Sequence, residues 1–312
     1  FLGFSYGFRP QRSPHQALDA LAVGITTKKV NWVLDADLRN FFDSLPRTTL
    51  RGSLARRVTD GVVRRLIDKW LKAGVLESGQ VHFPDAGTPQ GSVISPILSN
   101  VALHYIVDEW FTQVVQPRLH GPSSLVRFCD DFVMLFAHKA DAERVLAVLG
   151  KRLGKFGLQL HPNKTRLVDF RPRRGPGDSD ESSLPTSFNF LGFSHVWGTS
   201  RKGYTVVQQF TAKDRLARSL KAFNQQCRLM RHWPLELQRE RLCQMLNGHY
   251  GYFGISGNGR RLGKLHFRVR RLWYAWLSRR SWKSFLTWEK YERVLRRFPL
   301  PLPRIVHRYT AA

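Results

Sequence analysis

Apolar and polar positions follow both a strand period and a helical period along this chain, which predicts a mixed α and β fold. Residues 30–37 alternate apolar and polar side chains, as a half-buried strand does. Residues 93–110 are almost continuously apolar and predict a long buried helix that starts near Ser95 and Pro96, because proline suits the first helical turn. Two apolar runs on either side of Asp130 and Asp131 predict a β-hairpin.

Other segments complete this outline. Residues 47–75 predict a helix whose inward face carries Leu50, Leu54, Val58, Val62, Leu66 and Leu71. Four further segments are predicted: helices at 15–23 and 140–156, a polar loop at 171–186 and a last strand at 188–193. Beyond them the chain becomes helical, and one helical face carries Leu265, Val269, Leu272 and Trp276. We therefore predict two domains, 1–205 and 206–312.

Composition fits a folded intracellular protein. The 312 residues are 42% hydrophobic and 12% aromatic, enough to build a core. No apolar run reaches transmembrane length and no secretory signal is visible. The three cysteines form no C-x-x-C pair, which favours a reducing compartment and gives no zinc signature. Because the chain opens with Phe1 inside an ordered pattern, we expect that its natural amino end has been removed.

Positive charge is the second strong feature. Lys and Arg number 50 against 23 Asp and Glu, a net charge of +27. Residues 201–312 hold 25 basic and 5 acidic residues, a net +20, so the preceding 200 residues carry only +7. Such a field attracts polyanions. A membrane surface would also attract it, but Trp273, Tyr274 and Trp276 have a packed helical pattern instead of a lipid-facing stripe. RNA or DNA is therefore the expected partner.

Three aspartates carry the candidate chemistry. Asp130 and Asp131 lie between two apolar strands, and Asp37 ends another apolar run. An aspartate pair is more often a solvated turn, but here the flanking strands place the pair in a central sheet. Acids at strand ends suit Mg²⁺, which binds one or two carboxylates together with substrate phosphates. Two such ions support in-line phosphoryl transfer, so the pattern predicts a nucleic-acid polymerase.

Six motifs in a fixed order resemble the conserved blocks of reverse transcriptases. They are Ser5-Tyr-Gly-Phe-Arg-Pro10, Ala36-Asp-Leu-Arg-Asn-Phe-Phe-Asp43, Gly87-Thr-Pro-Gln-Gly-Ser-Val-Ile-Ser-Pro96, Phe128-Cys-Asp-Asp131, His161-Pro-Asn-Lys-Thr165 and Phe190-Leu-Gly-Phe193. Within that class the chain is most similar to bacterial group II intron reverse transcriptase/maturases of the endonuclease-lacking type. The tail, with Leu246-Asn-Gly-His-Tyr-Gly-Tyr-Phe253 and Phe298-Pro-Leu-Pro-Leu-Pro-Arg304, resembles the maturase domain, or domain X.

The resemblance implies an α+β fold shaped as a right hand, with an antiparallel palm sheet, partial helical fingers and an all-α thumb. Residues 1–205 would form fingers and palm, and residues 206–312 the thumb. The implied activity is RNA-directed DNA polymerisation, in which deoxynucleotides are joined to a primer 3′-hydroxyl. A maturase role in intron splicing and mobility would accompany it. The implied partners are intron RNA, a DNA primer or target and dNTPs, without a membrane, in a cytoplasmic ribonucleoprotein of a bacterium.

The resemblance also assigns residues. Asp37, Asp130 and Asp131 would hold two Mg²⁺ ions, with Asp35 and Asp43 as supporting or structural acids. Residues that would approach the nucleotide or template are Phe42, as a gate against ribose, with Gln90, Gly91, Arg9 and Lys164. Lys164 would protonate the leaving pyrophosphate. The thumb residues that would follow the nucleic-acid backbone are Arg260, Arg261, Lys264, Arg268, Arg271, Arg279 and Arg280.

Simpler interpretations exist for several of these residues. Phe42 could only pack in the core, Gln90 and Gly91 could form a helix-entry turn, and Lys164 and Arg9 could be solvated charges. The chain departs from the family at Phe128 and Cys129, where a tyrosine and a small residue are usual. Two alternatives therefore stay open: an RNA-binding splicing cofactor with weak or lost polymerase activity, and a related domesticated or defence reverse transcriptase. No Cys/His-rich module follows Arg304, so if the chain ends naturally, we expect target cleavage to come from elsewhere.

Overall fold

The computed structural model describes residues 1–72, 75–77, 80–82, 94–172, 186–200, 202–281 and 286–309. The chain divides into two compact units. The first contains Phe1–Leu191 and Trp197–Val207, and the second contains Gly192–Val196 and Gln208–Ala312. Within the described residues, no helix combines the length and the apolar composition needed to cross a bilayer.

A four-stranded antiparallel sheet forms the centre of the first unit. Its strands are β4 (Ser123–Phe128), β5 (Asp131–Phe136), β1 (Trp32–Ala36) and β6 (Arg166–Asp169), in that spatial order. β1 pairs with β5 on one side and β6 on the other. The strand predicted at 30–37 and the predicted hairpin are therefore confirmed. Four of the five residues of β1 are buried, and they lie on both faces of the strand.

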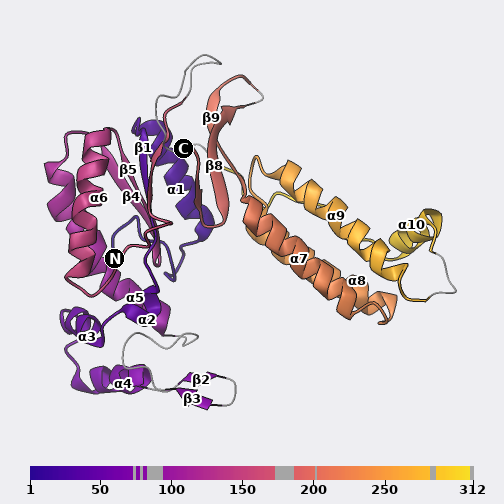
Figure 1. The fold of residues 1–312 in the computed structure, drawn as a ribbon, viewed down its shortest axis with the longest axis horizontal. Helices are drawn as coiled ribbons and strands as arrows, with labels where there is room; N and C mark the ends of the chain where they lie inside the picture. Colours follow the sequence, from indigo (N-terminus) through magenta and orange to yellow (C-terminus); the bar gives the residue numbers. More distant parts are fainter. Residues whose placement is uncertain are drawn as a thin grey trace. The chain divides into compact units, whose positions relative to one another are not determined.

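Helices cover both faces of this sheet (Figure 1). The face with Trp32 and Leu34 packs in one core cluster with α6 (Lys139–Gly154). The opposite face packs against α1 (Pro14–Thr27), where Gly24 lies so close to Leu135 that a Cβ would approach its side chain to 3.1 Å. Both helices were predicted from the sequence and both are confirmed.

A long helical segment follows the predicted pattern at its start and exceeds it at its end. α5 (Ser95–Leu103) begins with proline in its first turn, as expected. The helix then continues through two π-helical segments, η1 (His104–Asp108) and η2 (Phe111–Val115), and a 3₁₀ turn, η3 (Gln116–Arg118). Its apolar side chains join the sheet core. π-helical turns often occur near functional residues, and the first of them, η1, ends at Asp108.

The single helix predicted at 47–75 is wrong. Two helices occupy this region, α3 (Arg47–Ala55) and α4 (Gly61–Lys72). The short helix α2 (Phe41–Ser44) precedes them, and β2 (Val75–Glu77) and β3 (Gln80–His82) follow. The Asp60 carboxylate accepts the N–H groups of Val62 and Val63 and so starts a new helix with its own phase. As a result Val62 is 57% and Leu66 43% exposed.

The strand predicted at 188–193 is also wrong, because the Phe190-Leu-Gly-Phe193 motif is a turn. It joins β7 (Phe188–Phe190) to β8 (Phe193–Thr199), and β9 (Thr205–Thr211) follows. Leu191 and Gly192 have φ of 50° and 77°, a left-handed conformation that cannot continue a strand. Most of the loop predicted at 171–186 lies outside the described residues.

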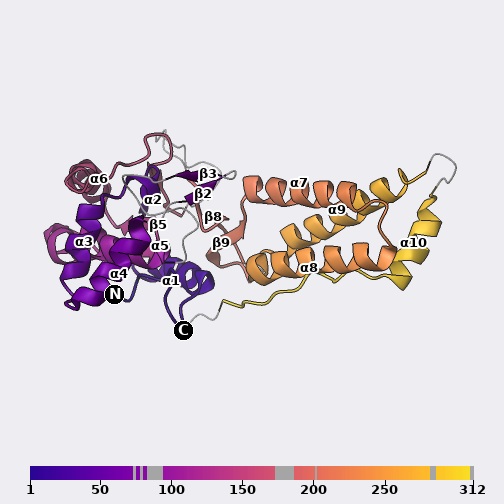
Figure 2. The ribbon, with the colours of Figure 1, turned by 90° about the horizontal axis from the view of Figure 1, so that it is seen from below.

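The second unit is mainly helical. It contains α7 (Lys213–Leu229), α8 (Leu235–Phe253), α9 (Gly259–Leu277) and α10 (Trp288–Arg297), and the first three lie alongside one another in both views (Figures 1 and 2). Of the face predicted on α9, Leu265 and Val269 are buried, but Leu272 and Trp276 are only partly buried. Trp273 is buried in their place, and its Nε1 donates to Gln238 Oε1 at 2.8 Å.

Candidate active site

Asp130 and Asp131 lie at the tip of the β4–β5 hairpin. Phe128 pairs with Asp131, so Cys129 and Asp130 form a two-residue turn. Cys129 has φ of 58°, a left-handed conformation that is rare outside glycine, asparagine and aspartate. Asp131 is the first residue of β5, and the side chains of the acidic pair therefore leave the sheet from one end of the hairpin.

Strand register brings Asp37 to the same end of the sheet. The last pair between β1 and β5 joins Ala36 to Phe132, so the next residue, Asp37, faces Asp131. The backbone holds Asp37 in this position, because its carbonyl accepts the N–H of His161 at 2.8 Å. Residues that are far apart in sequence thus meet at one sheet edge, as the hydrophobic pattern predicted.

Two cationic side chains approach the acids from the segment before and within β6. Lys164 Nζ lies 3.2 Å from Asp37 Oδ2, and Arg166 Nε lies 3.1 Å from Asp35 Oδ2. Asp35 and Asp37 alternate with Ala36 along β1 and so share the sheet face that also carries Asp131. The His161-Pro-Asn-Lys-Thr165 motif therefore forms part of the site.

Burial and mutual repulsion raise the pKa values of these carboxyl groups. Burial is the main cause for Asp131, whose pKa rises to about 7, with the charges of Asp35 and Asp130 adding to it and a backbone hydrogen bond from Leu191 opposing it. Burial also raises the pKa of Asp35 to about 6, although Arg166 opposes the rise. The pKa of Asp130 rises mainly through burial. The site therefore holds more negative charge than its own cations neutralise.

A hard divalent cation fits this donor set. The donors are carboxylate oxygens, which Mg²⁺ prefers, and burial, with neighbouring carboxylates adding to it, raises their pKa values. Among the residues that the structure describes, no three Asp, Glu, His or Cys side chains already enclose an ion position. The Lys164 ammonium stands beside Asp37, where a cation would bind.

The other predicted nucleotide residues have mixed surroundings. Phe42 in α2 is partly buried, packs against the core and contacts the Phe41 ring edge-on, with centroids 5.4 Å apart. Arg9 donates to the carbonyls of Leu2 and Ser5 at 2.7 and 2.6 Å, so its guanidinium organises its own loop. Three predicted features lie outside what the structure describes: Gln90, Gly91 and the side chain of Asp43.

Basic side chains form an exposed row on α9. Arg260, Lys264, Arg268 and Arg271 are exposed and recur at intervals of three or four residues, which places them on one helical face. Three other predicted residues have local contacts: Arg261 lies over the Phe210 ring, Arg279 over the Trp276 ring, and Arg280 donates to the Trp233 carbonyl.

Phe267 is 55% exposed within this row, a feature that the sequence analysis missed. Its ring lies under Arg271, with the guanidinium carbon 5.7 Å from the ring centroid. An aromatic residue outside the apolar phase of a basic helix is the signal that could have identified it. Such a ring suits base stacking in single-stranded nucleic acid.

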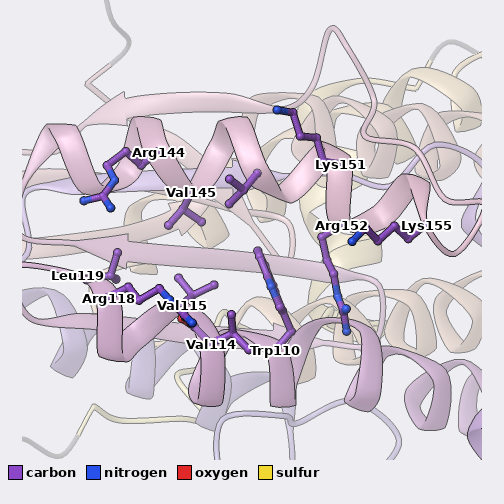
Figure 3. Close-up of a pocket in the computed structure, with 11 residues that line it drawn as sticks. Trp110, Val114, Val115, Arg118, Leu119, Arg144, Val145, Lys151, Arg152 and Lys155 are labelled. Atoms are coloured by element: carbon purple, nitrogen blue, oxygen red, sulfur yellow. The ribbon is translucent and has the colours of Figure 1, made fainter.

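A separate groove of about 570 Å³ lies between α6 and the helical segment that ends in η3 (Figure 3). Trp110, Val115 and Val145 contribute apolar surface, while basic side chains, including Arg118, Arg144 and Lys151, also line it. None of the predicted site residues lines this groove, so the candidate chemistry lies at the hairpin and not here.

An antiparallel sheet that presents three aspartates at one edge is typical of polymerases that transfer nucleotides. The reverse transcriptase (RNA-dependent DNA polymerase) family model matches residues 1–195. The chain therefore belongs to the reverse transcriptase family, and the α+β fold predicted from the sequence is confirmed. Reverse transcriptases in general depend on divalent metal ions.

Curated relatives point to intron-encoded proteins. The group II intron-encoded protein LtrA of Lactococcus lactis subsp. cremoris is 40% identical over 104 residues, which cover 33% of this chain and 17% of LtrA. Protein YkfC of Escherichia coli (strain K12) is 30% identical over 197 residues, 54% of this chain and 52% of YkfC. This chain thus spans about half of YkfC and a smaller part of LtrA.

A solved structure is also similar to this chain. Telomerase from Candida albicans, in complex with a fragment of telomeric RNA, is 13% identical with a TM-score of 0.49. The similarity covers 94% of this chain and 51% of the telomerase chain.

Proposed function

We propose that this chain is an RNA-directed DNA polymerase that extends a DNA primer on an RNA template with deoxynucleoside triphosphates. The observation that carries this proposal is the strand register, in which Ala36 pairs with Phe132 and Asp37 therefore faces Asp131 beside the Asp130 turn. Membership of the reverse transcriptase family supports it.

In this proposal Asp37, Asp130 and Asp131 hold two Mg²⁺ ions. When bound, the ions would stabilise the attacking and leaving oxygens of the displacement. The chain's own contribution is to fix the carboxylates at the ends of paired strands and to bury Asp131 among other carboxylates, which raises its pKa to about 7. Asp35, paired with Arg166, serves to shape the local charge.

Neighbouring residues would select and orient the nucleotide. Phe42 follows Asp37 by five residues, and its ring would exclude the ribose 2′-hydroxyl. Lys164, whose Nζ lies 3.2 Å from Asp37 Oδ2, would leave that carboxylate to bind a phosphate group and would protonate the departing pyrophosphate. The phosphate-binding role of Arg9 stays a prediction, since two backbone carbonyls already accept hydrogen bonds from its guanidinium.

The helical second unit would bind the RNA or the RNA–DNA hybrid. Its exposed row, Arg260, Lys264, Arg268 and Arg271, would contact phosphates, and Phe267 would stack on a base. Arg261, Arg279 and Arg280 would support this surface. Similarity to LtrA favours intron RNA as the partner and a maturase role in its splicing and mobility, in a bacterial cytoplasmic ribonucleoprotein.

Primer extension tests the proposal. The chain is incubated with an RNA template, a DNA primer, dNTPs and Mg²⁺, and Asp130→Ala is compared with Asp214→Asn, whose exposed carboxylate lies on α7. Extension by the wild type and Asp214→Asn, but not by Asp130→Ala, supports the polymerase. RNA binding by a wild type that extends no primer would refute it and favour the splicing cofactor. Splicing of an intron RNA with and without the chain tests the maturase role.

A further inference from the structure

A fully buried arginine lies beside the turn that carries Asp130. Arg127 is 0% exposed, and all five N–H groups of its guanidinium donate hydrogen bonds. Two of these bonds reach the carboxylate of Asp108, one from Nε to Oδ1 at 2.7 Å and one from Nη2 to Oδ2. The other three reach Asn100 Oδ1 at 2.7 Å, the Cys129 carbonyl at 2.8 Å and Ser5 Oγ at 2.9 Å.

Three distant segments meet at this guanidinium. Asp108 ends the π-helical segment η1, and Asn100 belongs to α5. Ser5 belongs to an amino-terminal segment that pairs with β4, since the Tyr6 N–H donates to the Arg127 carbonyl at 2.8 Å. Asn100 Nδ2 also donates to the Gly7 carbonyl at 2.7 Å, which links the helix to that segment.

The turn itself needs outside support. Cys129 has φ of 58°, a left-handed conformation that is strained for a non-glycine residue and persists where the surroundings fix it. Arg127 donates a hydrogen bond to the Cys129 carbonyl. The backbone nitrogen of Cys129 lies so close to Gly7 that a Cβ added to Gly7 would come within 2.5 Å of it. The turn is thus held from two sides.

We propose that Arg127 and Asp108 are positioning residues that fix the Cys129–Asp130 turn, and through it the two adjacent carboxylates, for the reaction. This inference rests on the proposed polymerase function. A buried ion pair adds little net stability compared with apolar residues of similar size. The planar guanidinium instead fixes geometry, because its five donors match five acceptors that come from four other residues.

Three changes separate positioning from simple core stability. Arg127→Lys keeps the positive charge but loses the planar guanidinium with its five donors. The double change Arg127→Met with Asp108→Leu removes both charges together and so leaves no buried charge unpaired. Gly7→Ala pushes on the Cys129 nitrogen from the other side. Each variant should lower kcat for primer extension by about 10- to 100-fold, leave the KM for dNTP within about twofold and raise the Mg²⁺ concentration for half-maximal rate.

Arg152→Met is the matched control. Arg152 donates to the carbonyls of Tyr105 and Ile106 in the same helical segment that holds Asp108, but it makes no contact with the hairpin turn in the described structure. It should keep the wild-type kcat and Mg²⁺ dependence. The double variant should melt at or above the temperature of Arg127→Met, because it leaves no buried Asp108 carboxylate without a partner. It should remain slow, because it still lacks the hydrogen bond to the Cys129 carbonyl.

Alkylation of the thiols gives a readout that needs no polymerase activity. Cys129 is buried in the turn and Cys227 is buried in the other unit. Mass spectrometry of tryptic peptides should show faster alkylation of Cys129 in the three test variants, with Cys227 unchanged. Wild-type kcat and Mg²⁺ dependence in the double variant, or unchanged Cys129 alkylation in all three, would overturn the positioning role. A wild type without extension refutes the proposed function, and the alkylation rates then decide whether the turn is held as inferred.

Discussion

Replacing Asp131 with asparagine should stabilise the metal-free protein while it removes polymerisation. Burial and neighbouring carboxylates raise the pKa of Asp131 to about 7 from an ordinary value of 3.8. The folded protein therefore binds this proton more tightly than the unfolded chain does. The free energy of unfolding must fall as pH rises between about 4 and 7, and the loss is complete above that range.

The size of the effect follows from the pKa difference. At about 1.4 kcal/mol per pKa unit, ionising Asp131 costs the fold about 4 kcal/mol above pH 7. The unit that holds Asp131 has roughly 200 residues, for which 1 kcal/mol shifts the melting temperature by 2–4 °C. Asp131→Asn should therefore melt about 10 °C above the wild type near pH 8 in the presence of a chelator, and close to the wild type near pH 4. Asparagine keeps the shape and can still accept the N–H of Leu191.

The assay is thermal unfolding across pH, with and without Mg²⁺. His249 works in the opposite direction, because burial lowers its pKa to about 4, but it is present in both proteins and cancels in their difference. Mg²⁺ should stabilise the wild type more than Asp131→Asn. Asp214→Asn, an exposed change in the other unit, should show no such pH-dependent gain. A constant difference between Asp131→Asn and the wild type at all pH values would refute the electrostatic reasoning.

Three further predictions concern the nucleotide and the RNA. Phe42→Ala should raise the ratio of ribonucleotide to deoxynucleotide incorporation by about tenfold or more, and unchanged discrimination in single-nucleotide extension would return Phe42 to a packing role. Lys164→Gln should slow the chemical step, as measured by rapid-quench kinetics, while primer–template affinity stays constant. An unaltered rate of that step would contradict this role. Lys264→Gln with Arg268→Gln should reduce the slope of log affinity against log salt for single-stranded RNA by about 1.4, whereas an equal slope in filter binding would place the RNA elsewhere.

The strands of the hairpin, the strand at 30–37 and the acids that end them could be predicted from the sequence because local pattern determines them. Apolar alternation in residues 30–37 and the runs around Asp130 are strong strand signals, and the acids terminate them. The register between β1 and β5, in which Ala36 pairs with Phe132 so that Asp37 comes opposite Asp131, is known only from the structure. The separate functional roles of the two units and the individual nucleotide contacts stay predictions.

Other features could not be read from local pattern because tertiary contacts decide them. The phase of α4 depends on the Asp60 cap, so Val62 and Leu66 are exposed where a continuous helix would have buried them. The Leu191-Gly192 turn interrupts a run that is apolar enough to form a strand. Arg127 gave a usable signal, since a charge inside an apolar strand requires a buried partner, but Asp108 could not be identified without the fold.

The β4–β5 hairpin carries two charged side chains with different surroundings, the buried Arg127 and the partly buried Asp131. Arg127 and Asp108 neutralise each other completely, and every guanidinium donor has an acceptor, so this pair can only hold geometry. Asp131, a few residues along the same hairpin, lies among carboxylates whose charges raise its pKa instead of lowering it. A fold selected for stability alone would have no reason to pair one charge so fully and leave the other so poorly compensated. We infer that a positive group arriving with the substrate compensates this charge, and that the buried pair holds the hairpin in place before that group binds.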